Sequence, residues 1–125
     1  MIKVSVEPAN KLVHAVLGDM LSVGDVAEFS RLEQAAARSL GVGSGGFVLL
    51  IETVGNLVQT QDVMGAFSRI IADSPLKAAR IAVVRDGVLT RMQSTRVMKE
   101  RGDTAVFDNA PDARAWLLAT EAPAT

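Results

Sequence analysis

The stretch that decides the fold is Gly45-Gly-Phe-Val-Leu-Leu-Ile-Glu-Thr-Val-Gly55, the most continuously apolar segment of the chain. Its apolar residues follow one another directly and are not spaced at helical intervals. Such a run is typical of a strand that is covered on both faces, as in the middle of a parallel sheet. We therefore expect a central strand here, and we expect the carboxyl end of that strand to be a place where function is located.

The residues before this strand predict a hairpin and then a helix. Apolar and polar residues alternate over residues 2–7, and a turn leads to a second apolar run at residues 11–18. Ser22 is placed to cap a helix of about four turns, and Gly41 is placed to end it. The expected order up to the central strand is therefore β-β-α-β.

The glycines between that helix and the central strand, Gly41-Val-Gly-Ser-Gly-Gly46, have the letters of the dinucleotide fingerprint GxGxxG. The fingerprint requires a strand before the glycines and a helix after them, so that the phosphates meet the helix N-terminus. The order here is reversed. We interpret the segment as a helix end and a loop, and we expect no cofactor.

Alternating units continue after the central strand. Thr60 can cap a helix whose apolar residues form one stripe and which ends at Asp73-Ser-Pro75. A strand at residues 79–87, a helix of weaker periodicity at 88–102 and a short strand at 103–107 follow, and a last helix begins at Asn109 and carries Trp116 and Leu117. The order β-β-α-β-α-β-α-β-α predicts an α/β fold with a mixed, mostly parallel sheet of four to five strands and about four helices. We expect one domain over residues 1–120 and a frayed tail at 121–125.

Composition excludes several classes of function. The chain has 125 residues, of which 49% are hydrophobic and 22% charged, as in ordinary globular domains. It has no cysteine, so disulfides, thiolate nucleophiles and thiolate metal sites are excluded. No apolar run approaches the ~18–20 residues that span a bilayer, and no signal peptide is recognisable, so we expect a cytoplasmic protein.

Charge is distributed unevenly. Seven of the 13 basic residues but only two of the 14 acidic ones lie between Lys77 and Arg101. This segment could be a solvated helix face or a contact for an anion, for which Arg91 and Arg96 are the candidates. It carries no aromatic residue on which a base could stack, so we expect no nucleic-acid partner.

Three segments carry a resemblance to a known family. They are Gly18-Asp-Met-Leu-Ser-Val-Gly-Asp-Val-Ala-Glu-Phe29, Arg80-Ile-Ala-Val-Val-Arg-Asp-Gly87 and Ala105-Val-Phe-Asp-Asn-Ala-Pro-Asp-Ala-Arg-Ala-Trp-Leu117. Together with the order of elements, they resemble the SpoIIAA-like branch of the STAS domains, the anti-sigma-factor antagonists. The resemblance implies a non-catalytic regulatory or ligand-binding domain. It also implies a similarity in fold to Sec14-type lipid-transfer domains.

In the classical antagonists, a Ser or Thr at the start of the helix after the central strand is phosphorylated by a partner kinase. Only Thr60 offers a hydroxyl at that place, and the family's paired hydroxyls and glycine are missing. Thr60 is therefore expected to be a helix cap first, and a phosphoacceptor only as the resemblance implies. Asp62 would oppose a phosphate there.

The leading hypothesis is a regulatory domain that binds a protein partner or a second copy of itself, as a homodimer. Its interaction loop is expected to comprise Gly55, Asn56, Leu57, Val58, Gln59 and Gln61. Met20 and Leu21, before the first helix, are expected to form an exposed apolar patch, as are Leu57 and Val58. The alternative is a carrier of a lipid or small hydrophobic ligand, with a pocket between sheet and helices.

Catalysis and metal binding have little support in the sequence. His14 is the only histidine and lies on the second strand, where its face is shared with Leu12 and Val16. Neither a GxSxG elbow nor a HExxH motif accompanies it. We expect a structural histidine, no metal site and no enzyme.

Overall fold

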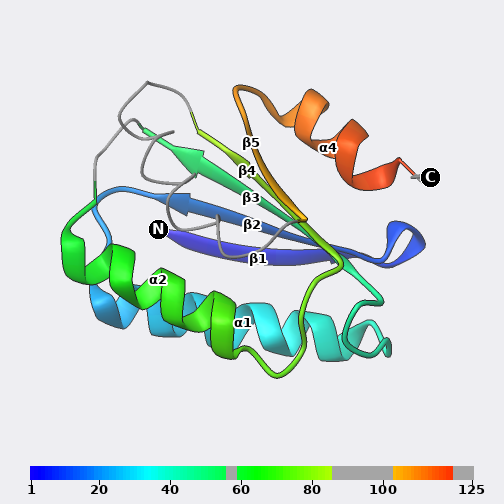
Figure 1. The fold of residues 1–125 in the computed structure, drawn as a ribbon, viewed down its shortest axis with the longest axis horizontal. Helices are drawn as coiled ribbons and strands as arrows, with labels where there is room; N and C mark the ends of the chain where they lie inside the picture. The colour runs from blue at the N-terminus through cyan, green and yellow to red at the C-terminus, as the bar shows by residue number, and fades with distance from the viewer. Residues whose placement is uncertain (56–58, 86–102, 120–125) are drawn as a thin grey trace.

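The chain folds into an α/β structure built on a five-stranded mixed sheet, seen in a computed structural model that describes residues 1–55, 59–85 and 103–119 (Figure 1). In these residues the order is β-β-α-β-α-β-β-α, with a short 3-10 turn η1 (Pro8–Asn10) inside the first hairpin. The predicted fold class is confirmed. The helix expected over residues 88–102 and the tail at 121–125 lie outside the described residues.

The strands lie in the sheet in their order along the chain. They are β1 (Ile2–Glu7), β2 (Leu12–Gly18), β3 (Val48–Val54), β4 (Arg80–Val84) and β5 (Thr104–Phe107). β1 and β2 pair in antiparallel register as the predicted hairpin, and every later neighbour is parallel. β3 is therefore the central strand, as its continuous apolar run predicts.

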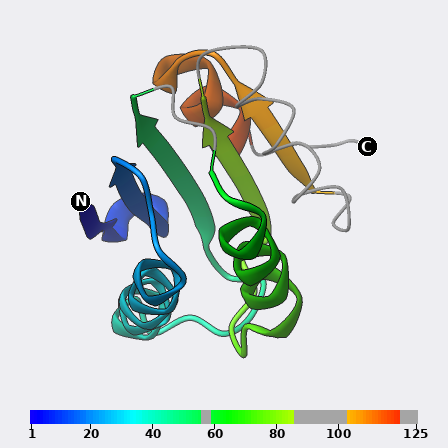
Figure 2. The same cartoon turned by 90° about the vertical axis from the view of Figure 1, so that its left-hand side faces the viewer.

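Helices cover the two faces of the sheet unequally. α1 (Val23–Ser39) and α2 (Gln61–Asp73) lie side by side on one face, as the end-on view in Figure 2 shows. α4 (Ala110–Leu118) packs on the opposite face against β3, β4 and β5. This placement agrees with right-handed crossovers from β2 to β3 and from β3 to β4, which put both connecting helices on the same side.

Two helix starts have the predicted caps. Ser22 and Asp25 form a capping box, in which the Ser22 hydroxyl accepts from the Asp25 N–H and the Asp25 carboxylate accepts from the Ser22 N–H. The Asn109 side chain accepts from the Asp112 N–H at 2.9 Å. At the other end of α1, Gly41 adopts a left-handed φ of 71°, which agrees with its predicted role in ending the helix.

The sheet has an apolar core on each face. The larger core, on the side of α1 and α2, includes Val13, Phe29, Phe47 and Ile51. The smaller core, under α4, consists of Leu12, Leu50, Ala82, Ala113 and Leu117. In the described ranges, no helix is both long and apolar enough to cross a membrane.

Candidate interaction surface at the carboxyl edge of the sheet

The carboxyl ends of β2 and β3 lie next to each other, because Gly18 is the register partner of Val54. Two short loops lie here: residues 19–22 before α1, and residues 59 and 60 directly before α2, which we call the loop before α2. Since β1 is antiparallel to β2, its first residues lie at the same edge of the sheet. We call this region the carboxyl edge.

Exposed apolar side chains gather at the carboxyl edge. The large apolar residues of the described chain that are most exposed are Met1 (49%), Met20 (52%), Val23 (46%) and Val54 (55%). A Cβ atom added to Gly18 would meet both Met1 and Val54, so these two side chains flank that glycine. We call the four residues the edge patch. Apolar groups left in water in this way are characteristic of contact surfaces.

Gln59 ties the two loops of the edge together. It is only 8% exposed; its side-chain oxygen accepts from the Leu21 N–H at 3.0 Å, and its side-chain nitrogen donates to the Asp19 carbonyl at 3.4 Å. The loop before α2 is thus held against the loop before α1. The sequence predicts that Gln59 belongs to the interaction loop. In the structure its side chain is buried and holds the backbone of Asp19 and Leu21 in place.

Leu21 was wrongly predicted to be exposed. Its side chain is 9% exposed and packs in the larger core, where its apolar surface is removed from water, while its N–H donates to Gln59. Met20, the other member of the predicted apolar pair, is exposed as expected.

Thr60 occupies the N-cap position of α2, but its side chain does not cap the helix. The Thr60 hydroxyl instead donates to the Asp62 carboxylate at 2.6 Å, so the predicted side-chain cap is wrong. The Asp62 carboxylate also accepts from the Val63 N–H at 3.2 Å, which is one of the groups that an N-cap side chain would otherwise bind. The same bond lowers the pKa of Asp62, together with hydrogen bonds from backbone N–H groups.

Carboxylates surround the edge patch. Asp19 follows β2 with its side chain 86% exposed, Asp25 lies in the first turn of α1, and Asp62 lies in the first turn of α2. The pKa of Asp25 is lowered, chiefly by the hydrogen bond from the Ser22 N–H. The lowered pKa values keep Asp25 and Asp62 charged at neutral pH, and the edge combines an apolar centre with an acidic rim.

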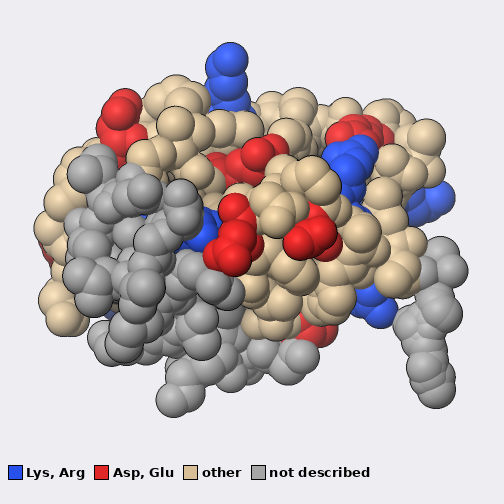
Figure 3. Space-filling view, turned by 90° about the horizontal axis from the view of Figure 1, so that it is seen from above, with Lys and Arg blue, Asp and Glu red and all other residues tan. Residues whose placement is uncertain are grey.

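Charged side chains also pair on the sheet face that carries α4, where acidic and basic groups lie near one another (Figure 3). His14 on β2 and Glu52 on β3 are 2.5 Å apart between Nε2 and Oε2. Nearby, Arg114 of α4 donates to the Glu7 carboxylate at the end of β1. His14 is thus half-buried and hydrogen-bonded, as its structural interpretation predicts.

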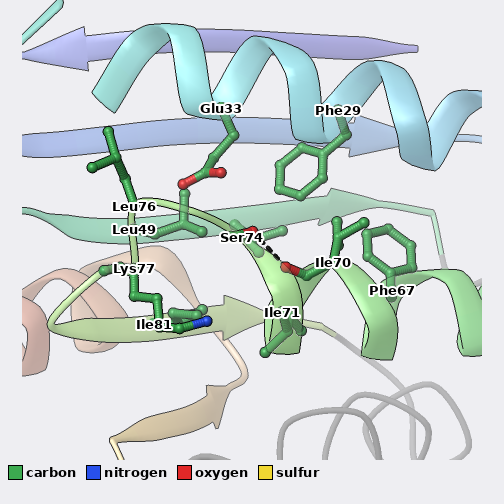
Figure 4. Close-up of a pocket in the computed structure, with 12 residues that line it drawn as sticks. Phe29, Glu33, Leu49, Phe67, Ile70, Ile71, Ser74, Leu76, Lys77 and Ile81 are labelled. Carbon is green, nitrogen blue, oxygen red and sulfur yellow. Dashed lines mark hydrogen bonds between the residues drawn. The ribbon is translucent and has the colours of Figure 1, made fainter. Parts of the chain in front are cut away.

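A narrow cavity of about 30 Å³ lies between α1, α2 and the sheet (Figure 4). Apolar side chains line most of it, among them Phe29, Phe67 and Ile70, and the Glu33 carboxylate points into it. Burial raises the pKa of Glu33, which accepts a hydrogen bond from the Gln34 side chain. The cavity has room for one or two water molecules.

Several residues named from the sequence lie outside the described chain. They are Asn56, Leu57 and Val58 of the interaction loop, and the anion candidates Arg91 and Arg96. Of the remaining loop residues, Gly55 has a left-handed φ of 83° and Gln61 is exposed in the first turn of α2. In the part of the chain that the structure describes, no cluster of histidine and acidic side chains could hold a metal ion.

Sequence reasoning missed Val23 and Val54 as members of the edge patch. Val54 was counted as part of a buried strand, although it is the last residue before Gly55, where a strand leaves the sheet. Val23 is the first residue of α1, and the first turn of a helix is commonly exposed. The sequence does contain a signal for both residues, because each lies at the end of an element, where side chains are commonly exposed. We gave more weight to their apolar character, which predicts burial.

Comparison with known proteins identifies no relative: no family model, no curated protein and no solved structure matches the chain. The class that can be stated is an α/β fold with a five-stranded mixed sheet.

Proposed function

We propose that the protein is a non-enzymatic regulatory domain that binds a protein partner through the carboxyl edge, in the manner of SpoIIAA-like STAS domains. The observation that carries the proposal is the edge patch. Its four members are the most exposed large apolar side chains of the described residues, and all four lie at one end of the sheet. Burial of such a patch by a partner removes apolar surface from water, which is the main driving force of association.

The edge is also organised to present this patch. Gln59 fixes the two loops relative to each other, so less conformational entropy is lost when a partner binds. The acidic rim of Asp19, Asp25 and Asp62 would select a partner with basic groups around an apolar centre. An apolar centre with a charged rim is the usual arrangement of protein interfaces.

The resemblance to STAS domains favours the same location. The family's regulated hydroxyl lies at the start of the helix after the central strand, which is where Thr60 lies in α2. A phosphate on Thr60 would be close to the Asp62 carboxylate that its hydroxyl now contacts. Repulsion between the two would push this loop away from its present conformation and change the edge.

Phosphorylation of Thr60 is tested by the intact mass of the protein after incubation with lysate of its source organism and ATP. The proposal predicts an adduct of one phosphate that Thr60→Ala abolishes. An adduct at another residue, or no adduct, would remove Thr60 from the proposal while leaving the edge patch in place.

The alternative function is that of a carrier for a lipid or small hydrophobic ligand. It is favoured by the apolar lining of the cavity between α1, α2 and the sheet. Typical ligand pockets enclose about 300–1,000 Å³, so α1 and α2 would have to move apart to admit such a ligand. Native mass spectrometry of protein purified from its source organism would detect a retained small molecule.

Partner binding is tested with two variants that introduce the same charge at two exposed positions, Met20→Glu in the edge patch and Ala35→Glu on the outer side of α1. A partner is first isolated with the wild-type protein and purified, and its dissociation constant is then measured for all three proteins. We expect Met20→Glu to weaken binding about tenfold or more, because a carboxylate would be buried without a partner. Ala35→Glu should leave the constant unchanged; equal affinity of all three proteins would contradict the proposal.

A further inference from the structure

The outer edge of β1 is a free edge of the sheet, since β2 is its neighbour on one side and no strand of the described chain pairs with the other. The Met1 carbonyl accepts from the Gly18 N–H at 2.8 Å, which makes these two residues a hydrogen-bonded pair. Such pairs alternate along an antiparallel ladder. The peptide groups of Lys3, Ser5 and Glu7 are therefore directed to β2, and those at positions 2, 4 and 6 are directed outward.

The sequence of this strand is complementary to itself. Residues 3–7 read Lys-Val-Ser-Val-Glu, with a serine in the centre, valines on both sides and opposite charges at the ends. We infer that two copies of the chain pair in antiparallel register along β1, with Ser5 opposite Ser5 of the second copy. This register places Val4 opposite Val6 and Lys3 opposite Glu7, each pair occurring twice.

Hydrogen bonding allows this register. Val4 and Val6 direct their free N–H and C=O groups outward, so each Val4–Val6 pair between the copies can exchange two backbone hydrogen bonds. Lys3 and Glu7 then form a non-hydrogen-bonded pair, the kind in which facing side chains approach most closely. Pro8 has no N–H and follows directly, so the pairing ends with the strand.

Charge selects this register from its neighbours. A shift that centres the pairing on Val4 would place Lys3 opposite Ser5, and one that centres it on Val6 would place Glu7 opposite Ser5. The first keeps the backbone hydrogen bonds, whereas the second places Val4 opposite Pro8, which has no N–H; both lose the attraction between Lys3 and Glu7. Only pairing about Ser5 matches opposite charges.

Both charged groups are available for this contact. Lys3 is exposed and has no ion-pair partner in the described residues. Glu7 accepts hydrogen bonds from Arg114 and Asn10 through the same oxygen, Oε1, so Oε2 can face the lysine of the second copy. Glu7 is thus held in place by its own chain while it faces the partner.

The pairing would make one continuous ten-stranded sheet with a two-fold axis at Ser5. Because α1 packs on β1, the two copies of α1 would flank this axis on one face. The carboxyl edges of the two copies would point in opposite directions, since the two β1 strands are antiparallel. The dimer would therefore carry two separate edge patches. The dimer inference does not depend on whether the edge patches bind a partner protein.

Single cysteines test the register directly, because the natural chain has none. Ser5→Cys would place the two thiols opposite each other at a non-hydrogen-bonded pair, with Cα atoms about 4.5 Å apart, a separation that a disulfide can bridge. Ala9→Cys is the matched control, because Ala9 is also exposed but would lie far from its counterpart. Under mild oxidation we expect a covalent dimer of Ser5→Cys to form at least about tenfold faster than one of Ala9→Cys.

Sedimentation of the cysteine-free protein over a range of concentrations gives the second readout. We expect a dimer whose dissociation constant rises about tenfold or more in Lys3→Glu, because like charges then face each other twice. Circular dichroism should show that this variant stays folded. Equal cross-linking of the two cysteine variants, or a wild-type protein that sediments only as a monomer, would overturn the inference and leave Lys3 as a charge that blocks edge pairing.

Discussion

The two faces of the sheet are built from neighbouring residues of the same strands and yet differ in nearly every respect. In β2, Val13 enters the larger apolar core under α1 and α2, whereas the next residue, His14, faces the opposite side and bonds to Glu52. In the part of the chain that the structure describes, α1 and α2 cover one face and α4 covers the other. The difference teaches that the face under α1 and α2 holds the larger apolar core, whereas the face under α4 combines a smaller core with charged pairs.

The contrast includes a pair of carboxyl groups that respond to opposite forces. Glu33 of α1 is 6% exposed, and its burial raises its pKa above the ordinary value of 4.5. Glu7 of β1 has its pKa lowered below that value, chiefly by the hydrogen bond from Arg114. Desolvation determines the direction of the shift for Glu33, and a charged partner determines it for Glu7.

The largest effect on the free energy of unfolding should come from truncating a side chain of the larger core, under α1 and α2. We expect Phe47→Ala to destabilise the protein by about 3–5 kcal/mol, because Phe47 is fully buried and its removal leaves a cavity. Leu117→Ala, in the smaller core under α4, should cost nearer to about 2 kcal/mol, since half-exposed neighbours such as Phe107 and Trp116 can relax into the space. Chemical denaturation measures both; a larger cost for Leu117→Ala would reverse the comparison.

A smaller effect should come from Gln34, which links α1 to the turn after α2. Its side chain accepts from the Leu76 N–H at 3.0 Å and donates to the Leu76 carbonyl at 2.9 Å. Gln34→Ala would leave these groups without partners, and we expect a cost of about 1–3 kcal/mol. Arg38→Ala, at an exposed position of the same helix, should change the free energy of unfolding by less than about 0.5 kcal/mol and serves as the control.

The carboxyl groups of Glu33 and Glu7 should change the free energy of unfolding with opposite sign. Because the folded state raises the pKa of Glu33, it binds more protons than the unfolded chain at pH values above 4.5, and this residue lowers stability as pH rises. Glu33→Gln should therefore stabilise the protein at pH 7 by roughly 0.5–2 kcal/mol. The gain should disappear below about pH 4, where the carboxyl is protonated in both states.

Glu7 should show the reverse and the smallest effect. Its lowered pKa contributes stability above pH 4.5 that is lost as pH falls through the folded-state value. We expect Glu7→Gln to cost no more than about 1 kcal/mol at pH 7, because the pair with Arg114 is partly exposed. Chemical denaturation of both variants from pH 3 to pH 8 measures the two changes in stability. If both changes had the same dependence on pH, burial of Glu33 and the Arg114 bond to Glu7 could not be the causes of the two pKa shifts.

Much of the fold could be predicted because its signals are local. The continuous apolar run before Val54, the alternation in β1, and the caps at Ser22 and Asn109 each depend on a few adjacent residues. The order of the glycines at residues 41–46 relative to helix and strand was enough to predict a loop. These patterns reflect backbone preferences that operate within one element.

The details of the site depend on contacts between distant residues, which no local pattern encodes. The bond from the Leu21 N–H to Gln59 joins residues 38 positions apart, and the Leu21 side chain, which was expected to be exposed, packs against distant residues of the larger core. Thr60 has the local signature of a cap, but the Val63 N–H that it would bind donates to Asp62. The sequence predicts an interaction surface after the central strand, but which side chains are exposed there depends on contacts that no local pattern encodes.

The central claim is that the carboxyl edge is the surface that meets a partner, and photo-cross-linking tests it most directly. A benzophenone amino acid is placed at Met20 in one protein and at Ala35 in another, and each is irradiated in lysate of the source organism. The account predicts a specific adduct at Met20 that excess unlabelled protein suppresses, and none at Ala35. Adducts of equal yield at both positions, or an adduct at Ala35 alone, would contradict it.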